Sequence, residues 1–247
     1  MPNGIREVIA LVEGETEMEF INHVISVHLQ SHNLSIRPVL SGNPRRTQHG
    51  GVRNWANTAK DIQRYLKAGK ILTTLFDFYA LAKDWPSRLE AGNKPWDQRG
   101  ITVEQAVQSA ITKLMDSSYN PACFVPCIQV HEFESLLFVN PAATALSLAT
   151  VCKTDATNSW ASKIERELTQ ILTEHNQKAE SVNDSPETAP SKRLKKIVNG
   201  YDKRAWGYQV VKDVTITELR SGCHWLHNWL SQLEALGQTT QKGDDPI

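Results

Sequence analysis

Short apolar runs and longer segments with helical periodicity alternate over the first 130 residues. The apolar runs are rich in β-branched residues and predict strands over 6–12, 35–40, 71–78 and 122–130. Apolar positions at helical spacing predict helices over 16–32, 54–68 and 103–116. Alternation of this kind is typical of a mostly parallel sheet with crossover helices. The pattern therefore predicts an α/β fold.

One segment interrupts this alternation. Residues 80–100 are turn-rich and predict a long excursion from the sheet. Trp85 and Trp96 lie in it, where exposed aromatic side chains could serve a protein partner or nucleic acid. The sequence does not decide between these roles.

The remainder of the chain has a helical pattern without strand signals. Helices are predicted over 158–176, 191–199, 203–213 and 221–236, with a polar loop over 177–190. We therefore expect an α/β core over 1–140 and a mainly helical region over 141–247 that packs on it. Trp225 and Trp229 are one helical turn apart, which favours a core or partner interface over a stacking platform for bases.

Charge gives no global attraction to nucleic acid, because 27 Lys and Arg residues balance 27 Asp and Glu residues. Local patches still matter for binding. Two basic clusters, one at Arg45 and Arg46 and the other at Lys192 and Arg193, are candidate phosphate contacts. The alternative for each is a solvated loop or helix face.

The apolar stretches and the cysteines bear on the compartment. No stretch reaches the roughly 18 apolar residues of a spanning helix, and the N-terminus reads as a first strand, not as a signal peptide. Cys123 and Cys127 lie in an apolar strand-like run without the paired spacing of a zinc site. We expect reduced cysteines in a soluble cytoplasmic protein.

Acidic residues follow the predicted strands. Glu13 ends the first strand, with Glu17 one helical turn later; Asp77 follows a buried strand, and Glu132 and Glu134 follow the last one. The carboxyl ends of parallel strands meet at one edge of a sheet. Carboxylates gathered there repel one another unless a cation neutralises them, and Mg²⁺ or Mn²⁺ suits such oxygen ligands. The alternative is that each acid only favours the start of a helix.

The segment after the last strand holds further candidates. His131 is a candidate ligand or general base, or a polar residue at a strand end. Glu132 and Glu134 point the same way if the chain is extended and diverge if a helix begins there. In the second case we expect only one of them to contact a metal.

The run Val12 to Glu17 (VEGETE) resembles the opening Glu-Gly motif of TOPRIM domains, in the form found in OLD-type nucleases. The second motif of that family is Asp-x-Asp; here it reads Asp77-Phe78-Tyr79, so a tyrosine replaces the second acid. The whole chain is also similar to a TOPRIM-related family of bacterial and archaeal proteins of unknown function, through VEGETE, FDFY, HEFESLLF, PSKRL and GYDK.

This resemblance implies a TOPRIM-like fold and a metal-dependent nuclease or phosphotransfer enzyme acting on DNA. Glu13, Asp77 and an acid of the HEFE segment would hold Mg²⁺ or Mn²⁺, with Glu17 or His131 orienting or deprotonating water. It also implies phosphate contacts for Lys192, Arg193 and Lys203. Genes of the family often neighbour ABC- or SMC-like ATPases, which implies such a partner in a defence or DNA-processing system.

The competing reading is a non-catalytic TOPRIM-like subunit that binds and regulates the ATPase. Tyr79 favours it, because a neutral phenol is a poor ligand for Mg²⁺.

Overall fold

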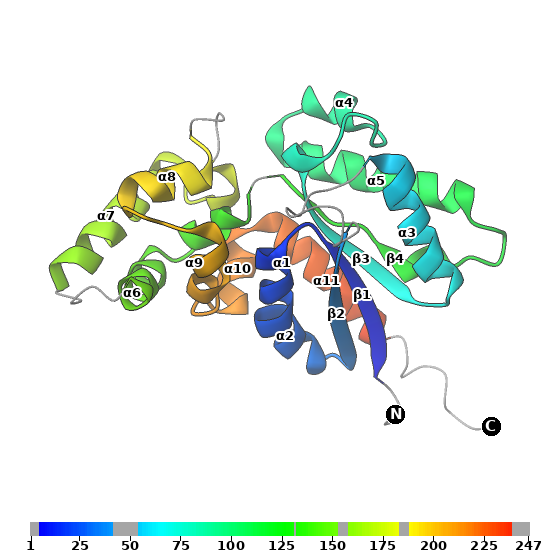
Figure 1. The fold of residues 1–247 in the computed structure, drawn as a ribbon, viewed down its shortest axis with the longest axis horizontal. Helices are drawn as coiled ribbons and strands as arrows, with labels where there is room; N and C mark the ends of the chain where they lie inside the picture. Colours follow the sequence, from blue (N-terminus) through cyan, green and yellow to red (C-terminus); the bar gives the residue numbers. More distant parts are fainter. Residues whose placement is uncertain (1–4, 42–53, 131, 153–157, 183–187, 239–247) are drawn as a thin grey trace. The chain divides into compact units, whose positions relative to one another are not determined.

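The computed structural model describes residues 5–41, 54–130, 132–152, 158–182 and 188–238 (Figure 1). These residues form two compact units. The described residues up to Val130, together with 228–238, make up the first unit, and 132–227 make up the second. The expected division into 1–140 and 141–247 stays a prediction.

The first unit is built on a parallel sheet of five strands, which confirms the predicted α/β fold. The strands are β1 (Arg6–Val12), β2 (Leu34–Leu40), β3 (Ile71–Asp77), β4 (Phe124–Val125) and β5 (Ile128–Gln129). Their order is β2-β1-β3-β4, and β5 also pairs with β3. All four pairings are parallel, with Val12 opposite Leu40 on one side and Leu75 on the other.

Helices connect these strands. They are α1 (Glu15–Phe20), α2 (Ser26–Gln30), α3 (Trp55–Lys67), α4 (Arg88–Gly92) and α5 (Trp96–Leu114), and the later residues of α11 (His224–Gln238) also belong to this unit. A π-helical segment, Ile21–Ile25, joins α1 to α2. The helix predicted over 16–32 is therefore correct in place but not uniform in hydrogen bonding.

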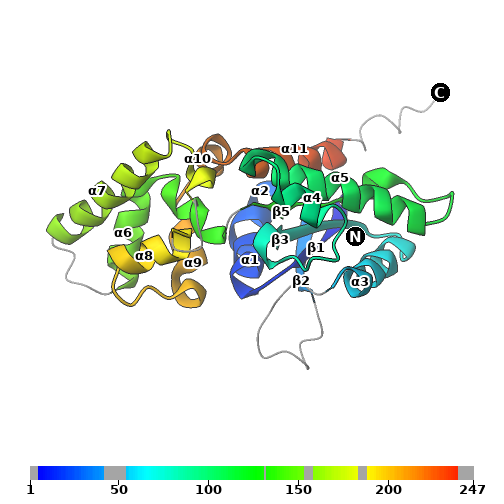
Figure 2. The same cartoon turned by 90° about the horizontal axis from the view of Figure 1, so that it is seen from above.

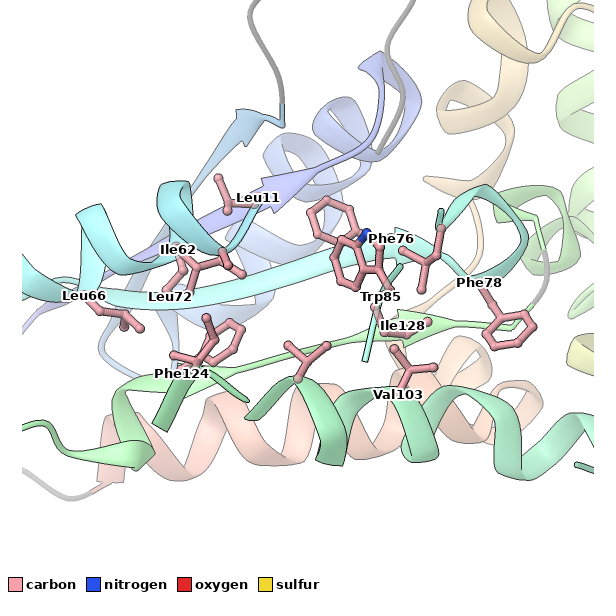
Figure 3. Packing of buried hydrophobic residues seen from close by; sticks show 14 of the residues in the cluster. Leu11, Ile62, Leu66, Leu72, Phe76, Phe78, Trp85, Val103, Phe124 and Ile128 are labelled. Atoms are coloured by element: carbon pink, nitrogen blue, oxygen red, sulfur yellow. The ribbon is translucent and has the colours of Figure 1, made fainter. Parts of the chain in front are cut away.

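Each face of the sheet is covered by helices, as Figure 2 shows from above. On one face, Leu72 and Phe76 of β3 pack with apolar residues of α3 and α5, and Trp85 lies against the ring of Phe76 at a centroid distance of 5.7 Å (Figure 3). On the other face, the indole Nε1 of Trp229 in α11 donates to the Thr73 hydroxyl at 2.7 Å. Alternation along β3 produces this division, because successive side chains of a strand point to opposite faces.

The strand predicted over 122–130 is two short strands. Pro126 stands between β4 and β5 and has no N–H to donate to a neighbour. Thr74 of β3 spans the interruption, since its hydroxyl donates to the Cys127 carbonyl at 3.0 Å and accepts from the Cys127 N–H at 2.9 Å. These side-chain hydrogen bonds add to the backbone pairing, in which the Phe76 N–H donates to the Cys127 carbonyl at 3.3 Å.

Residues 80–100 are less extended and more buried than the sequence predicts. Helix α5 begins at Trp96, directly after Pro95, and not near residue 103. Thr102 lies inside this helix, and its hydroxyl donates to the Gln98 carbonyl. Trp85 is only 3% exposed, so its side chain belongs to the core and is not available to a partner.

The second unit is helical, as predicted for this part of the chain. Its helices are α6 (Pro141–Val151), α7 (Asn158–Glu174), α8 (Pro190–Ile197), α9 (Lys203–Val211) and α10 (Ile216–Gly222), and a 3-10 helix spans Phe133–Phe138. Helix α6 has no counterpart among the predicted elements, because its alanine- and leucine-rich sequence has no polar face to reveal a period. The helix predicted over 221–236 is α11, which begins at His224.

Among the described residues, none of the helices is both long enough and apolar enough to cross a membrane.

Candidate active site at the carboxyl ends of the strands

The centre of the sheet provides the natural place for a site. From β1 the chain passes to β2 on one side of β1 and later returns to β3 on the other side. The carboxyl ends of β1 and β3 therefore lie at a switch point of the strand order, where open α/β sheets commonly bind ligands. Glu13 follows the last residue of β1, and Asp77 is the last residue of β3.

Glu13 and Asp77 are brought together there. The Asp77 N–H lies 3.4 Å from Oε2 of Glu13, and both residues are half-buried. One carboxylate oxygen of Asp77, Oδ1, accepts from the Tyr79 N–H at 2.8 Å, which holds the turn after β3. Two predicted site residues are thus adjacent, although 64 positions separate them in the sequence.

Glu17 belongs to the same neighbourhood. It is 6% exposed and lies in α1. Its Oε2 would be 3.1 Å from a β-carbon added at Gly14, the residue that follows Glu13. The glycine leaves room for this carboxylate to approach the end of β1. Glu13 and Asp77 are in contact and Glu17 lies beside Gly14, so we call these three acids the strand-end carboxylates, although their carboxylate oxygens do not all lie within 4.8 Å of one another.

Two arginines beside the strand-end carboxylates were not predicted. Arg99 of α5 donates from Nη1 to the Tyr79 hydroxyl at 2.7 Å. Arg88 of α4 donates from Nε to the Phe78 carbonyl at 3.0 Å, and its guanidinium lies 3.8 Å from the centroid of the Phe78 ring. Both come from the turn-rich segment, where no period in the sequence indicates which side chains turn back to the sheet.

The electrostatic setting of Arg88 links it to the acids. Burial lowers the pKa of Arg88, the charge of Arg99 acts in the same direction, and Tyr79 and Asp77 oppose both. An arginine remains charged at neutral pH in spite of such a shift. Positive charge is thus fixed next to Asp77 at the edge of the sheet.

Glu132 and Glu134 are in the second unit, and their predicted convergence with the strand-end carboxylates stays a prediction. Oε2 of Glu132 accepts from the Ser191 N–H at 2.9 Å, at the start of α8. Glu134 is fully buried, and the carboxylates of Glu134 and Glu132 add to burial in raising the pKa of Tyr201. Glu132 therefore has a structural role that the sequence did not indicate.

The predicted phosphate contacts differ in their surroundings. Lys192 is exposed on α8. Arg193 is engaged inside the second unit, where Nε donates to the Thr188 carbonyl at 2.9 Å and Nη2 is 3.3 Å from Nε2 of His175. Lys203 begins α9, but its side chain lies outside the description, as do residues Arg45, Arg46 and His131 altogether.

Two of the predicted aromatic residues are in the core or close to it. Trp229 is 2% exposed, which confirms the preference for a core position over a stacking platform. Trp225 is half-buried, and its backbone N–H donates to Oε2 of Glu180 at 3.3 Å.

Sequence comparison places the chain in a family. A profile described as Domain of unknown function (DUF4276) matches residues 12–234. The chain belongs to the DUF4276 family. No curated protein matches it.

Three solved structures of one protein are similar to this DUF4276 chain. They are of the C-terminal region of the OLD protein from Xanthomonas campestris pv. campestris, phased with iodine, mercury and platinum. Identity is 14 to 15%, the TM-score is 0.41 to 0.42, and the matches cover 96% of this chain and 96 to 98% of those chains.

The strand-end carboxylates suit a hard divalent cation. They supply only oxygen donors, and each is at least partly withdrawn from water. Withdrawing several like charges from water is costly unless a cation offsets the repulsion. Mg²⁺ and Mn²⁺ favour donors of this kind and keep water or phosphate oxygens in their remaining positions. The donor set of the DUF4276 chain thus fits the predicted ions.

Proposed function

We propose that this protein is a metal-dependent nuclease, or a related phosphotransfer enzyme, that acts on DNA. The observation that supports it best is the approach of the Glu13 carboxylate to Asp77 at the switch point of a parallel sheet, with Glu17 alongside. The resemblance of residues 12–17 to the opening motif of TOPRIM domains points to the same chemistry.

Each residue has a distinct task in this proposal. Glu13 and Asp77 hold Mg²⁺ or Mn²⁺, which when bound supplies a Lewis acid toward the scissile phosphodiester and an acidified water. Glu17, buried beside Gly14, orients the attacking water and receives its proton. The hydrogen bond from the Tyr79 N–H to Oδ1 of Asp77 holds the turn after β3 and thereby restricts the orientation of the Asp77 carboxylate.

The two arginines extend the site toward the substrate. Arg88 and Arg99 add positive charge next to Asp77, where a nucleic-acid backbone must approach the metal. Guanidinium groups contact phosphate oxygens in two-point geometry and stabilise the charge that develops during phosphoryl transfer. Exposed Lys192 is a further candidate contact for the DNA backbone.

One observation favours a second function. The hydroxyl of Tyr79 accepts from Arg99 in the position where the TOPRIM motif has its second acid. A site with one ligand fewer holds its metal less firmly, which fits a non-catalytic subunit that binds an ABC- or SMC-like ATPase and regulates it.

A plasmid-cleavage assay with matched acid variants tests the first function. Glu13→Gln and Asp77→Asn keep the size of each side chain and remove its charge. We expect each to lose Mn²⁺ binding in calorimetry and to slow cleavage by roughly 100-fold or more.

Glu15→Gln serves as the control, because Glu15 lies in the same turn but is exposed. Wild-type cleavage rates in the Glu13 and Asp77 variants would contradict the proposal. Metal binding without cleavage in the wild type, together with copurification of an ATPase, would support the regulatory function instead.

A further inference from the structure

A second group of metal-ligating side chains lies in the first unit, formed by His28, His32 and Glu234. His28 is in α2, His32 is in the turn that follows it, and Glu234 is in α11. One potential ligand atom from each of the three lies within 4.8 Å of the other two. None of them belongs to the strand-end carboxylates.

The contacts within this group converge on one oxygen. Nε2 of His28 is 2.7 Å from Oε1 of Glu234, and Nε2 of His32 is 3.9 Å from the same oxygen. The first distance is a hydrogen bond, whereas the second is too long for one. A hydrogen bond therefore accounts for the orientation of His28 but not for that of His32, whose ring centroid is 5.0 Å from that of His28.

A shared ion accounts for all three orientations. Zinc binds imidazole nitrogen and carboxylate oxygen at about 2.1 Å, which puts two of its tetrahedral ligands about 3.4 Å apart. The two contacts of Oε1, at 2.7 and 3.9 Å, lie on either side of that spacing.

We propose that His28, His32 and Glu234 bind one Zn²⁺ ion, or a similar late first-row divalent ion, with water in the fourth position. The turn after α2 brings the ring of His32 next to that of His28, with ring centroids 5.0 Å apart. Two nitrogen donors select such ions over Mg²⁺, which prefers oxygen donors throughout.

The surroundings keep the three ligands in place without an ion. A β-carbon added at Gly237 would lie 1.8 Å from the His32 carbonyl oxygen, so α11 runs directly against the turn that carries His32. Nη1 of Arg6 also donates to the Leu236 carbonyl at 2.6 Å. The ligands are thus positioned by backbone contacts, and only side chains need to adjust when the ion binds.

The three side chains are exposed enough for an ion to reach them, and they come from distant parts of the sequence. The side chains of His28, His32 and Glu234 are 21%, 28% and 13% exposed, so the ligands are shielded yet reachable from solvent. His28 and Glu234 are 206 positions apart in the sequence. An ion between them closes that long loop and stabilises the packing of α11 on α2.

The experiment uses the full-length chain, freed of metal by a chelator and titrated with Zn²⁺ in a calorimeter. Excess Mg²⁺ is present so that the strand-end carboxylates do not contribute. We expect one equivalent of Zn²⁺ to bind and to raise Tm by about 5 °C at a hundredfold excess over Kd. His28→Gln, His32→Gln and Glu234→Gln should each weaken binding by roughly 100-fold.

His23→Gln is the matched control, since His23 is exposed on the same helical stretch and pairs with Glu19. It should bind Zn²⁺ as the wild type does, and so should the Glu13→Gln/Asp77→Asn double variant. The visible spectrum of the Co²⁺-loaded wild type gives a reading that does not depend on any variant folding, with intense tetrahedral bands expected.

Several results would overturn the assignment. They are less than one equivalent of bound Zn²⁺, unchanged affinity in the three ligand variants, or loss of Zn²⁺ binding in the double variant. Loss of Zn²⁺ binding in the double variant would instead indicate that Zn²⁺ binds to the strand-end carboxylates.

Discussion

The two candidate metal centres of the first unit differ in donor chemistry and in how the fold creates them. The strand-end carboxylates offer only oxygen, and β1 and β3 bring them together because parallel strands end at one edge. The group of His28, His32 and Glu234 offers nitrogen and oxygen, and it exists only because α11 returns to pack beside α2. The strand-end carboxylates depend on the sheet, whereas the group of His28, His32 and Glu234 depends on the packing of α11 beside α2.

If both proposals hold, one unit would separate two kinds of ion by donor type alone. Hard ions favour the carboxylates, and late transition metals favour the imidazoles. Substitutions in one group should leave the other intact, because the two draw on different elements of the fold.

The most direct test of the difference between the two centres is to measure each variant with each of the two ions. In the Glu13→Gln/Asp77→Asn double variant we expect DNA cleavage with Mn²⁺ to fall by roughly 1,000-fold, while Zn²⁺ affinity stays within a factor of about two. Glu234→Gln should weaken Zn²⁺ binding and leave DNA cleavage with Mn²⁺ unchanged. Calorimetry and a plasmid-nicking assay on the same preparations measure both, and a variant that loses both ions would show that the centres are coupled.

A glycine substitution tests the packing on which the histidine group depends. Gly237→Ala forces a β-carbon toward the His32 carbonyl, where 1.8 Å is available, so α11 has to shift. We expect the free energy of unfolding to fall by about 3 kcal/mol, with weakened Zn²⁺ binding, in denaturant titrations.

Gly14→Ala is the counterpart at the strand ends. Its nearest neighbour is the movable Oε2 of Glu17 at 3.1 Å, so we expect a smaller loss of stability. If both substitutions lower the free energy of unfolding equally, the two centres do not differ in how well they accommodate an added β-carbon.

The burial of Glu104 makes the stability of the first unit depend on pH. Burial raises the pKa of Glu104 to about 7, against the hydrogen bond from the Ile128 N–H at 2.8 Å. A raised pKa means that folding favours the protonated acid, so this contribution to stability is lost as pH rises from about 4.5 to 7.

Glu104→Gln should abolish that loss, which we put at about 2 kcal/mol after allowance for partial exposure. Urea titrations between pH 4.5 and 8 measure it, with Glu90→Gln as an exposed control. A pH-independent wild type would contradict the role of Glu104.

The smallest expected effect concerns the missing acid. Tyr79→Asp restores the second acid of the TOPRIM motif and should tighten Mn²⁺ binding by roughly tenfold. Tyr79→Phe removes only the hydroxyl that accepts from Arg99 and should leave Mn²⁺ affinity nearly unchanged. If the aspartate variant binds no better, the Asp77 corner is not part of the metal site.

Local pattern alone was enough to predict most of the sheet. Strands β1, β2 and β3 follow apolar runs, and an acid after such a run is visible in the sequence, which is why Glu13 and Asp77 could be predicted. Pro126 is equally visible, yet its effect on the strand over 122–130 depends on Thr74, a residue of another strand.

The sequence by itself determined the class of fold and the place of Glu13 and Asp77 at the ends of strands, because both follow from short-range periodicity and from the shared direction of parallel strands; the metal centre that these acids would form stays a prediction. Tertiary structure alone decided the rest. It turned Arg88 and Arg99 toward Tyr79 and Asp77 out of a segment without periodicity, buried Trp85, and set Glu234 beside His28. Such contacts join residues far apart in the chain, and packing selects them through shape and polarity that no local pattern records.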